Sequence, residues 1–273
     1  WLLRGGIVLF GLSLTFAQVV GLGPKVLLLD ALIITAVLLV GYQIGTRVLG
    51  MDRETTLLTS AGSAICGAAA VLATESTIRS KPAAASMAVA TVVLFGSLAM
   101  LTYPLLYPWL GMDEGLFGVY IGATVHEVAQ VVAAGDAVGP DALANAVIVK
   151  LVRVMLLVPF LLVVGQWWLR QPTQEGAEAG GQGAHKAKLV IPWFALGFIA
   201  MVGVNSVVTL PAPLHSGLVL AGQIALTMAM AALGINTRMS RLKALGVKPF
   251  LLALILFVLL VVGGGMASAL LMG

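Results

Sequence analysis

Long apolar runs alternate with short polar breaks from one end of the chain to the other. Each run holds about 20 residues, enough for a helix to cross the roughly 30 Å hydrocarbon layer of a bilayer. Glycine, proline and charged residues fill the breaks, as they do at turns between helices. The pattern predicts an all-α, multi-pass membrane protein with nine apolar elements, at residues 3–22, 26–48, 56–78, 83–109, 116–134, 142–169, 189–209, 214–236 and 249–272.

One connection is long and polar. Residues 170–188 are rich in Gly, Ala and Gln, a composition typical of a flexible linker. No other segment interrupts the apolar pattern, so we expect a single transmembrane domain over residues 1–273. The chain begins at Trp1, already inside an apolar run, and we expect one or two further helices ahead of it.

The composition excludes a water-soluble domain. The chain is 60% hydrophobic and 10% charged, with a mean hydropathy of +1.07, whereas a soluble protein needs a larger polar surface. The net charge of +4 comes mostly from basic residues between the apolar runs, so we expect no nucleic-acid partner. Cys66 is the single cysteine in the sequence, which excludes an internal disulfide.

The basic residues between the runs indicate the orientation. If all nine runs cross the membrane, ten Lys and Arg residues face one side and three face the other, namely Lys25, Arg79 and Lys81. The positive-inside rule places the larger group in the cytoplasm. In an alternative topology, the third and fifth runs are re-entrant and Arg79 and Lys81 join the larger group, giving twelve against one. Charge bias leaves both topologies open.

The third run contains small and polar residues near its middle. The segment Gly62–Gly67 has two glycines together with Ser63 and Cys66. Small residues allow close packing of membrane helices. The same residues also permit a broken helix, whose backbone must then line a cavity or lie inside the protein. We take Ser63, Cys66 and Gly67 as candidates for substrate binding.

The fifth run contains two ionisable residues, His126 and Glu127. His126 and Gln130 are four residues apart and would share one face of a helix. The string HEVAQ is similar to the zinc-protease motif HExxH, but Gln130 replaces the second histidine, which excludes that zinc site. Ionisable groups within spans are costly and mark solute or proton paths. Because histidine titrates near physiological pH, we expect His126 to bind substrate and His126 with Glu127 to couple a proton or ion; hydrogen bonding to neighbouring helices is the alternative.

Lys150 and Arg153 lie three residues apart in the sixth run and therefore on one helix face. Each costs ~2.5–3.5 kcal/mol near the centre of an isolated span, so each needs a partner, an aqueous cavity or an anionic ligand. Arginine offers two parallel donors to an oxyanion, while lysine acts as a point charge. We expect both to bind substrate. Pairing with Glu127 and snorkelling towards the headgroups are the alternatives.

Two further polar residues lie within apolar runs. We take Asn205, in the seventh run, as a residue that lines the substrate path. We expect Asp30, in the second run, to lie near a membrane interface. Neither position forms a recognisable motif with its neighbours.

Six strings point to a family: SAICGAAA (63–70), VVLFGSLAML (92–101), GATVHEVAQVVAAG (122–135), AVIVKLVRVMLLVP (146–159), IPWFALGF (191–198) and AMAALGINT (229–237). On these strings, the chain resembles the UPF0324 family (conserved hypothetical 698 type), bacterial inner-membrane proteins that are named as sulfate exporters. The resemblance covers essentially the whole chain in one order. It implies a location in the bacterial inner (plasma) membrane.

The resemblance also implies a fold. The family is related to the sodium/proton antiporters and bile-acid symporters, which contain inverted five-helix repeats with crossing broken helices. On this plan, residues 1–109 form an incomplete first repeat and residues 116–272 the second, and the third element corresponds to the eighth. A second internal similarity, Gly62–Thr74 with Gly122–Ala134 at an offset of sixty residues, instead suits paired re-entrant hairpins. We favour the five-helix repeat.

The function that follows is secondary active transport, with export of a small inorganic or sulfur-containing anion such as sulfate or sulfite. The expected partners are that anion, membrane lipid, a coupling proton or sodium ion, and a second copy of the chain in a homodimer. We assign no catalytic residue, metal or cofactor and do not expect an enzyme. The alternatives are an intramembrane enzyme and a receptor or structural subunit that transports nothing.

Overall fold

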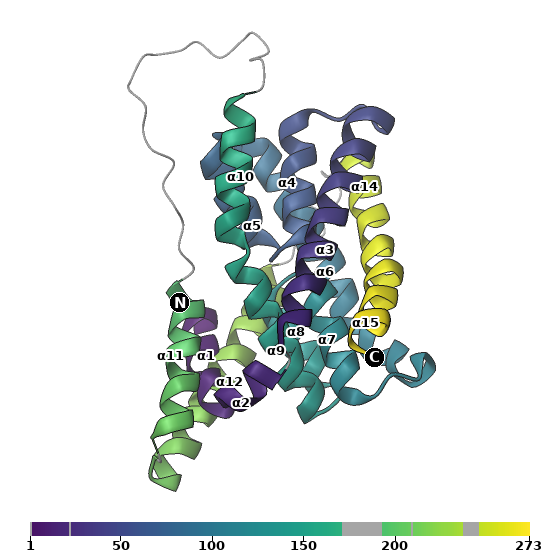
Figure 1. The fold of residues 1–273 in the computed structure, drawn as a ribbon. Coiled ribbons are helices and arrows are strands. Elements are labelled where there is room, and N and C mark those ends of the chain that lie inside the picture. Colours follow the sequence, from purple (N-terminus) through teal and green to yellow (C-terminus); the bar gives the residue numbers. More distant parts are fainter. Residues whose placement is uncertain (1, 22, 171–192, 209, 237–245) are drawn as a thin grey trace, which may run out of the picture.

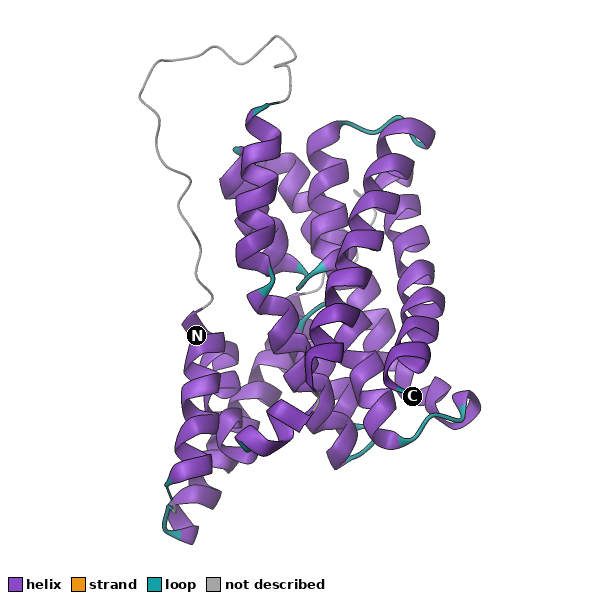
Figure 2. Ribbon diagram, viewed as in Figure 1, coloured by secondary structure: helices purple, strands orange, loops and turns teal. Residues whose placement is uncertain are grey.

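The computed structural model describes the chain except for residues 1, 22, 171–192, 209 and 237–245. The described residues form helices and no strand (Figure 2), which confirms the all-α prediction. Most of the predicted linker, residues 171–188, lies outside the described part. Four helical stretches are long and apolar enough to cross a membrane: Gly23–Val48, Pro82–Leu110, Pro140–Trp168 and Val247–Met272.

The helices follow the apolar runs closely, with extra breaks. In chain order they are α1 (Leu2–Phe10), α2 (Phe16–Gly21), α3 (Gly23–Gln43), α4 (Arg53–Ala64), α5 (Ala68–Ile78), α6 (Pro82–Leu110), α7 (Glu114–Thr124), α8 (Val128–Asp136), α9 (Pro140–Met155), α10 (Leu157–Leu169), α11 (Trp193–Val207), α12 (Ala212–Asn236), α14 (Val247–Val258) and α15 (Gly265–Met272). Short segments of other helical geometry are η1 (Gly11–Ser13), η2 (Ile44–Val48) and η3 (Leu259–Gly264).

The helices form two groups (Figure 1). Helix α1 packs against α11 and α12, and these three make the smaller group. Helices α3 to α10 pack together with α14 and α15 in a larger group that contains the ionisable residues of the third, fifth and sixth runs. The groups meet where α11 contacts α9 and α12 contacts α8.

The third run folds back on itself. Helix α4 ends at Ala64 and α5 begins at Ala68, and the backbone N–H of Lys81, just after α5, donates to Glu54 Oε2 at 3.0 Å, at the start of α4. These two residues are 27 positions apart, and a straight helix would separate them by about 40 Å. Helices α4 and α5 therefore form a helical hairpin, which we call the first hairpin.

The fifth run folds back in the same way. Helix α7 ends at Thr124 and α8 begins at Val128. At the open end, Glu114 Oε1 accepts hydrogen bonds from the backbone N–H groups of Asp141 at 2.7 Å and Ala142 at 3.3 Å. Helices α7 and α8 therefore form a second hairpin.

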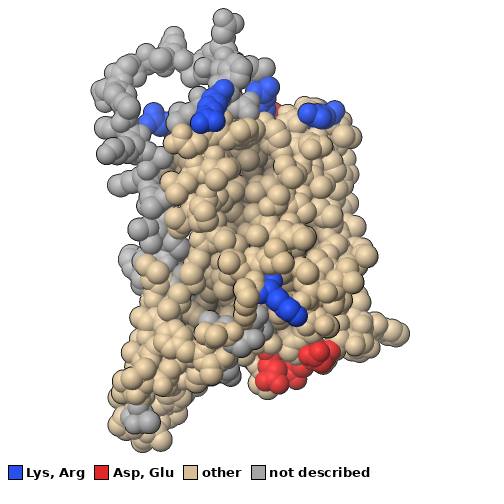
Figure 3. Space-filling model, viewed as in Figure 1, with Lys and Arg blue, Asp and Glu red and all other residues tan. Residues whose placement is uncertain are grey.

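The two hairpins enter the larger group from opposite ends. Helix α6 starts beside the open end of the first hairpin and ends beside the open end of the second, after 29 residues. In Figure 3, most Lys and Arg side chains on this face lie at the upper end, and acidic side chains gather at the lower end, beneath a further basic side chain. The hydrogen bond of Lys81 to Glu54 places Lys81 at the same end as Arg53, as the re-entrant topology predicts.

The broken elements are the third and the fifth, whereas the five-helix plan pairs the third with the eighth. The eighth element has no break that matches the break in the third, because α12 runs from Ala212 to Asn236 without interruption. The pairing of the third element with the eighth is therefore wrong in this respect. The offset of sixty residues, which we did not favour, matches both breaks. Its physical basis is local: Gly67 takes a positive φ of 66° at one break, and Val125 and Glu127 take extended backbone at the other.

Cysteine labelling from each side of the membrane tests this topology. We expect Lys81→Cys and Asp136→Cys to react with an impermeant thiol reagent from opposite sides, because both side chains are exposed at opposite ends of the larger group. If every run crossed the membrane, both would react from the same side. The unmodified chain gives the background, since Cys66 is buried.

Candidate functional site

The tip of the first hairpin depends on a glycine. Helix α4 ends at Ala64, and Ile65, Cys66 and Gly67 connect it to α5. Gly67 has φ 66°, a conformation that side chains disfavour. A Cβ atom on Gly67 would also lie 2.5 Å from Cγ of Glu127, which belongs to the second hairpin. Glycine therefore both makes the turn and lets the two tips touch.

The tip of the second hairpin consists of Val125, His126 and Glu127. Glu127 is the N-cap residue of α8, and its backbone N–H donates to Oε1 of Gln130 at 3.1 Å. The prediction that His126 and Gln130 share a helix face is wrong. His126 lies in the break between α7 and α8, whereas Gln130 is in α8. Glu127 itself is half-buried, while His126 is 1% exposed.

Lys150, from α9, joins the two tips. Its Nζ donates to the carbonyl oxygen of Ile65 at 2.8 Å and to that of Val125 at 2.7 Å. These carbonyls end α4 and α7, where the helix dipoles concentrate negative partial charge. The buried ammonium thus satisfies both helix ends, and the alternatives of snorkelling or pairing with Glu127 are wrong: Lys150 is 1% exposed and no ion pair joins the two within the described chain.

Arg153 continues the polar face of α9. Its Nε donates to the carbonyl oxygen of Ala64 at 2.7 Å, so it also holds the end of α4. The side chain is fully buried, and Nη1 and Nη2 have no hydrogen-bond partner.

Asp30 of α3 interacts electrostatically with Arg153 and Lys150. Its carboxyl group is fully buried and unpartnered, so Asp30, which we expected near a membrane interface, lies inside the larger helix group.

Glu127 lies beside helix N-termini, whereas Lys150 and Arg153 bind helix C-termini. Its Oε1 accepts from the backbone N–H of Ala68 at 3.4 Å, at the start of α5. One carboxylate therefore lies beside the N-terminal ends of α5 and α8, where the dipoles favour negative charge. Ala69, next along α5, is exposed, so the tips are open on this side.

The remaining predicted residues of the tips have unused polar atoms. The hydroxyl of Ser63 and Nδ1 of His126 are buried and without a hydrogen-bond partner. The thiol of Cys66 is free and buried. Buried polar groups of this kind require a water molecule, a ligand or another conformation to satisfy them. The structure thus gathers Ser63, Cys66, Gly67, His126, Glu127, Lys150 and Arg153 at the two tips.

Asn205 does not belong to this cluster. Its Nδ2 donates to the carbonyl oxygen of Leu14 at 3.0 Å, and its Oδ1 lies 3.2 Å from Nε2 of His215. The same Nε2 lies 3.0 Å from the carbonyl oxygen of Leu12. Asn205 and His215 therefore satisfy carbonyls near the break after η1, in the smaller helix group. No sequence pattern singled out His215: one partner, Leu12, lies 203 positions away, and the other, Asn205, lies ten positions away in no recognisable motif.

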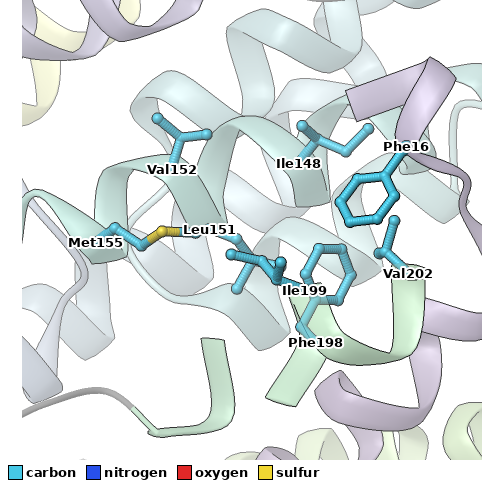
Figure 4. A pocket seen from close by; sticks show the side chains of 8 residues that line it. All are labelled: Phe16, Ile148, Leu151, Val152, Met155, Phe198, Ile199 and Val202. Carbon is cyan, nitrogen blue, oxygen red and sulfur yellow. The ribbon is translucent and has the colours of Figure 1, made fainter. Parts of the chain in front are cut away.

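One cavity is apolar and separate from the tips (Figure 4). It has a volume of about 90 Å³ and lies between α9, α11 and α2. Its lining consists of Phe16, Ile148, Leu151, Val152, Met155, Phe198, Ile199 and Val202. Apolar cavities of this kind stay dry, so this one offers nothing to an anion. Within the described chain, no group of three His, Cys, Asp or Glu residues could hold a metal ion.

Comparisons with known proteins agree with the sequence resemblance. The profile of the family described as conserved hypothetical protein 698 matches residues 1–253. The UPF0324 membrane protein PA5383 of Pseudomonas aeruginosa is 48% identical, over 98% of this chain and 76% of that protein. The UPF0324 inner membrane protein YeiH of Escherichia coli K12 is 46% identical, over 97% of this chain and 74% of its own length. No solved structure matches. The chain therefore belongs to the UPF0324 family of multi-pass inner-membrane proteins.

Proposed function

We propose that this protein is a secondary active transporter that exports a small inorganic or sulfur-containing anion such as sulfate or sulfite. The observation that carries the proposal is the bonding of one buried ammonium, Lys150, to the tips of both hairpins. Irregular backbone at membrane depth is tolerated where it lines a cavity or lies inside protein. Broken helices that meet near the middle of the membrane form the solute sites of many transporters.

We further propose an inverted repeat of a span and a hairpin. The first unit is α3 with the first hairpin and the second is α6 with the second hairpin. Glu54 and Glu114, sixty positions apart, play the same role in closing the two hairpins. Because α3 and α6 run in opposite directions, the second unit is inverted relative to the first. Such inverted repeats place their solute site at the interface between the units.

The groups at the tips suit an oxyanion. Arg153 has two free Nη donors, which match the spacing of two oxygens in a sulfate or sulfite. Lys150 adds positive charge, although its contacts with two carbonyls leave it one unused donor. Glu127 would repel an anion unless it carried a proton. Solute binding and proton uptake are thereby linked at Glu127, with His126 beside it.

The division into two helix groups supplies the moving parts. Lys150 and Arg153 hold both tips on α9, so the tips and α9 are expected to move together. Among the described residues, the group of α1, α11 and α12 meets them mainly along α8 and α9. Relative movement of the two groups would expose the tips alternately to each side, as alternating access requires. We prefer transport to intramembrane catalysis because no hydrogen-bonded nucleophile–base pair lies at the described tips.

Flux measurements test the proposal. Purified protein in proteoliposomes is expected to move labelled sulfate or sulfite saturably when a pH or sodium gradient is imposed. Arg153→Lys keeps the charge but loses the paired donors, and we expect anion affinity to fall roughly ten- to hundredfold, the equivalent of about 1.5–3 kcal/mol. The absence of flux for every small anion, under every gradient, would contradict the proposed function. An unchanged affinity in Arg153→Lys would remove that residue from the site.

A further inference from the structure

Asp30 and Arg153 are complementary groups that do not meet. Both are 0% exposed. Both carboxylate oxygens of Asp30 and both Nη atoms of Arg153 are without a hydrogen-bond partner. Their charges interact, yet no hydrogen bond or ion pair joins them in the described chain. Arg153 uses its third nitrogen, Nε, on the carbonyl oxygen of Ala64 at the first hairpin tip.

The free-energy cost of leaving Asp30 and Arg153 unpaired depends on whether Asp30 carries a proton. A buried carboxylate without donors is strongly unfavourable, and it either pairs with a cation or takes up a proton. If Asp30 is neutral, Arg153 directs its charge at the end of α4. If Asp30 is ionised, it draws the guanidinium towards itself and away from Ala64. The pair therefore has two arrangements, and a single proton selects between them.

We propose that Asp30 is a proton-binding site that controls the first hairpin tip through Arg153. Protonation of Asp30 leaves Arg153 bonded to Ala64 and locks the tip. Loss of the proton recruits Arg153 and loosens it. A role for Asp30 in coupling a proton to transport rests on the proposed transport function. Its control of the first hairpin tip does not depend on transport.

Among the groups around α3, Arg153 is the cation that can respond to a change in the charge of Asp30. Lys150 is committed to two backbone carbonyls of the tips. Tyr120, on α7, donates its hydroxyl to the carbonyl oxygen of Val261. The elements packed against α3 carry these other titratable or charged groups: Cys66 at the first tip, Glu114 at the open end of the second hairpin, Asp141 at the start of α9, and Arg47, Arg53, Glu54 and Lys248 near the far end of α3. Ser268, on α15, adds a buried hydroxyl without a partner.

The single cysteine of the chain reports on the tip. Cys66 lies in the turn between α4 and α5 and is 5% exposed. The rate at which a small methanethiosulfonate reagent modifies Cys66 in purified protein is measured from about pH 6 to pH 8.5. Each rate is divided by the rate for the unfolded protein at the same pH, which removes the intrinsic titration of the thiol.

We expect this ratio to rise about tenfold with pH in the natural protein, the change that 1.4 kcal/mol of tip opening produces. In Asp30→Asn, which is neutral at every pH, the ratio should stay at its low-pH value. Asp136→Asn, which alters an exposed acid at the end of α8, should behave like the natural protein. A ratio independent of pH in the natural protein, or an equal rise in Asp30→Asn, would overturn the inference.

A second variant keeps the test decisive if Asp30→Asn does not fold. Arg153→Lys has one compact charged group in place of separate Nε and Nη donors, so it should lose the pH dependence even with Asp30 intact. A rise equal to that of the natural protein would again overturn the inference. The labelling needs no solute. If no anion is transported but the labelling ratio depends on Asp30, transport is refuted and the control of the tip by Asp30 stands. If an anion is transported but the ratio does not depend on Asp30, only the control of the tip is refuted.

Discussion

Lys150→Met is expected to destabilise the protein more than any other single substitution at the tips. The methionine fills much of the same space but leaves the carbonyl oxygens of Ile65 and Val125 buried without a donor. Each unsatisfied carbonyl costs about 1–3 kcal/mol, and the ends of α4 and α7 also lose the opposing charge. We expect a loss of roughly 2–6 kcal/mol in the free energy of unfolding. A thermal unfolding curve in detergent measures it as a fall in Tm.

Lys248→Met is the matched control. Lys248 also donates to a backbone carbonyl, that of Gly50 at 3.5 Å, but the contact is exposed. Water replaces the lost donor at such a site, so the change should stay within about 0.5 kcal/mol. Equal shifts in Tm for the two variants would show that the ammonium of Lys150 does not hold the tips together.

Gly67→Ala is expected to have the second-largest effect, because it acts on backbone and packing together. Gly67 has φ 66° and ψ −134°, a combination that is adopted almost only by glycine and costs another residue roughly 1–3 kcal/mol. The new methyl group also meets Cγ of Glu127 at 2.5 Å and forces the two tips apart. Overpacking of this kind adds about 1–3 kcal/mol. We expect a large fall in Tm together with loss of anion flux.

Gly111→Ala separates the two causes. Gly111 also has a positive φ, 63°, but its ψ is 17° where that of Gly67 is −134°, and a Cβ atom there has nothing within 4 Å. This variant should therefore show the smaller backbone cost of an ordinary left-handed residue, without any crowding. Adding Glu127→Ala to Gly67→Ala should restore part of the lost stability by removing the colliding group. If Gly67→Ala were no worse than Gly111→Ala, close contact between the tips would play no part in stability.

The helical class and most helix limits were predictable because a bilayer imposes a strong hydrophobic pattern. The two hairpins were not, since an apolar run of about 20 residues serves one span or two half-length helices equally well. The clearest signal was electrostatic: the re-entrant topology gave the cleaner charge split, twelve against one. Glu54 and Glu114, in the first turns of α4 and α7, could not reveal the hairpins, because they accept from backbone N–H groups 27 positions away.

The candidate site was half predictable for a related reason. Lys150 and Arg153 are conspicuous because charges within apolar runs are rare. Their partners are backbone carbonyls, which every residue has, so no sequence pattern identifies them. Asp30 was misplaced because it lies only eight residues into its helix and its electrostatic partner is on α9. The position of Asn205 away from the tips was not predictable, because its partner is the backbone carbonyl of Leu14, 191 positions away.

The shared ammonium has a consequence for leakage. The two hairpins face opposite sides of the membrane, yet the same Lys150 holds both tips. As long as either carbonyl stays in contact, the ammonium keeps a hydrogen bond and its charge remains satisfied. A pore open to both sides at once would remove both acceptors, each a charge-assisted bond of about 1.5–3 kcal/mol. In the transporter that we propose, one side chain would thus disfavour a continuous channel and limit the leakage of ions.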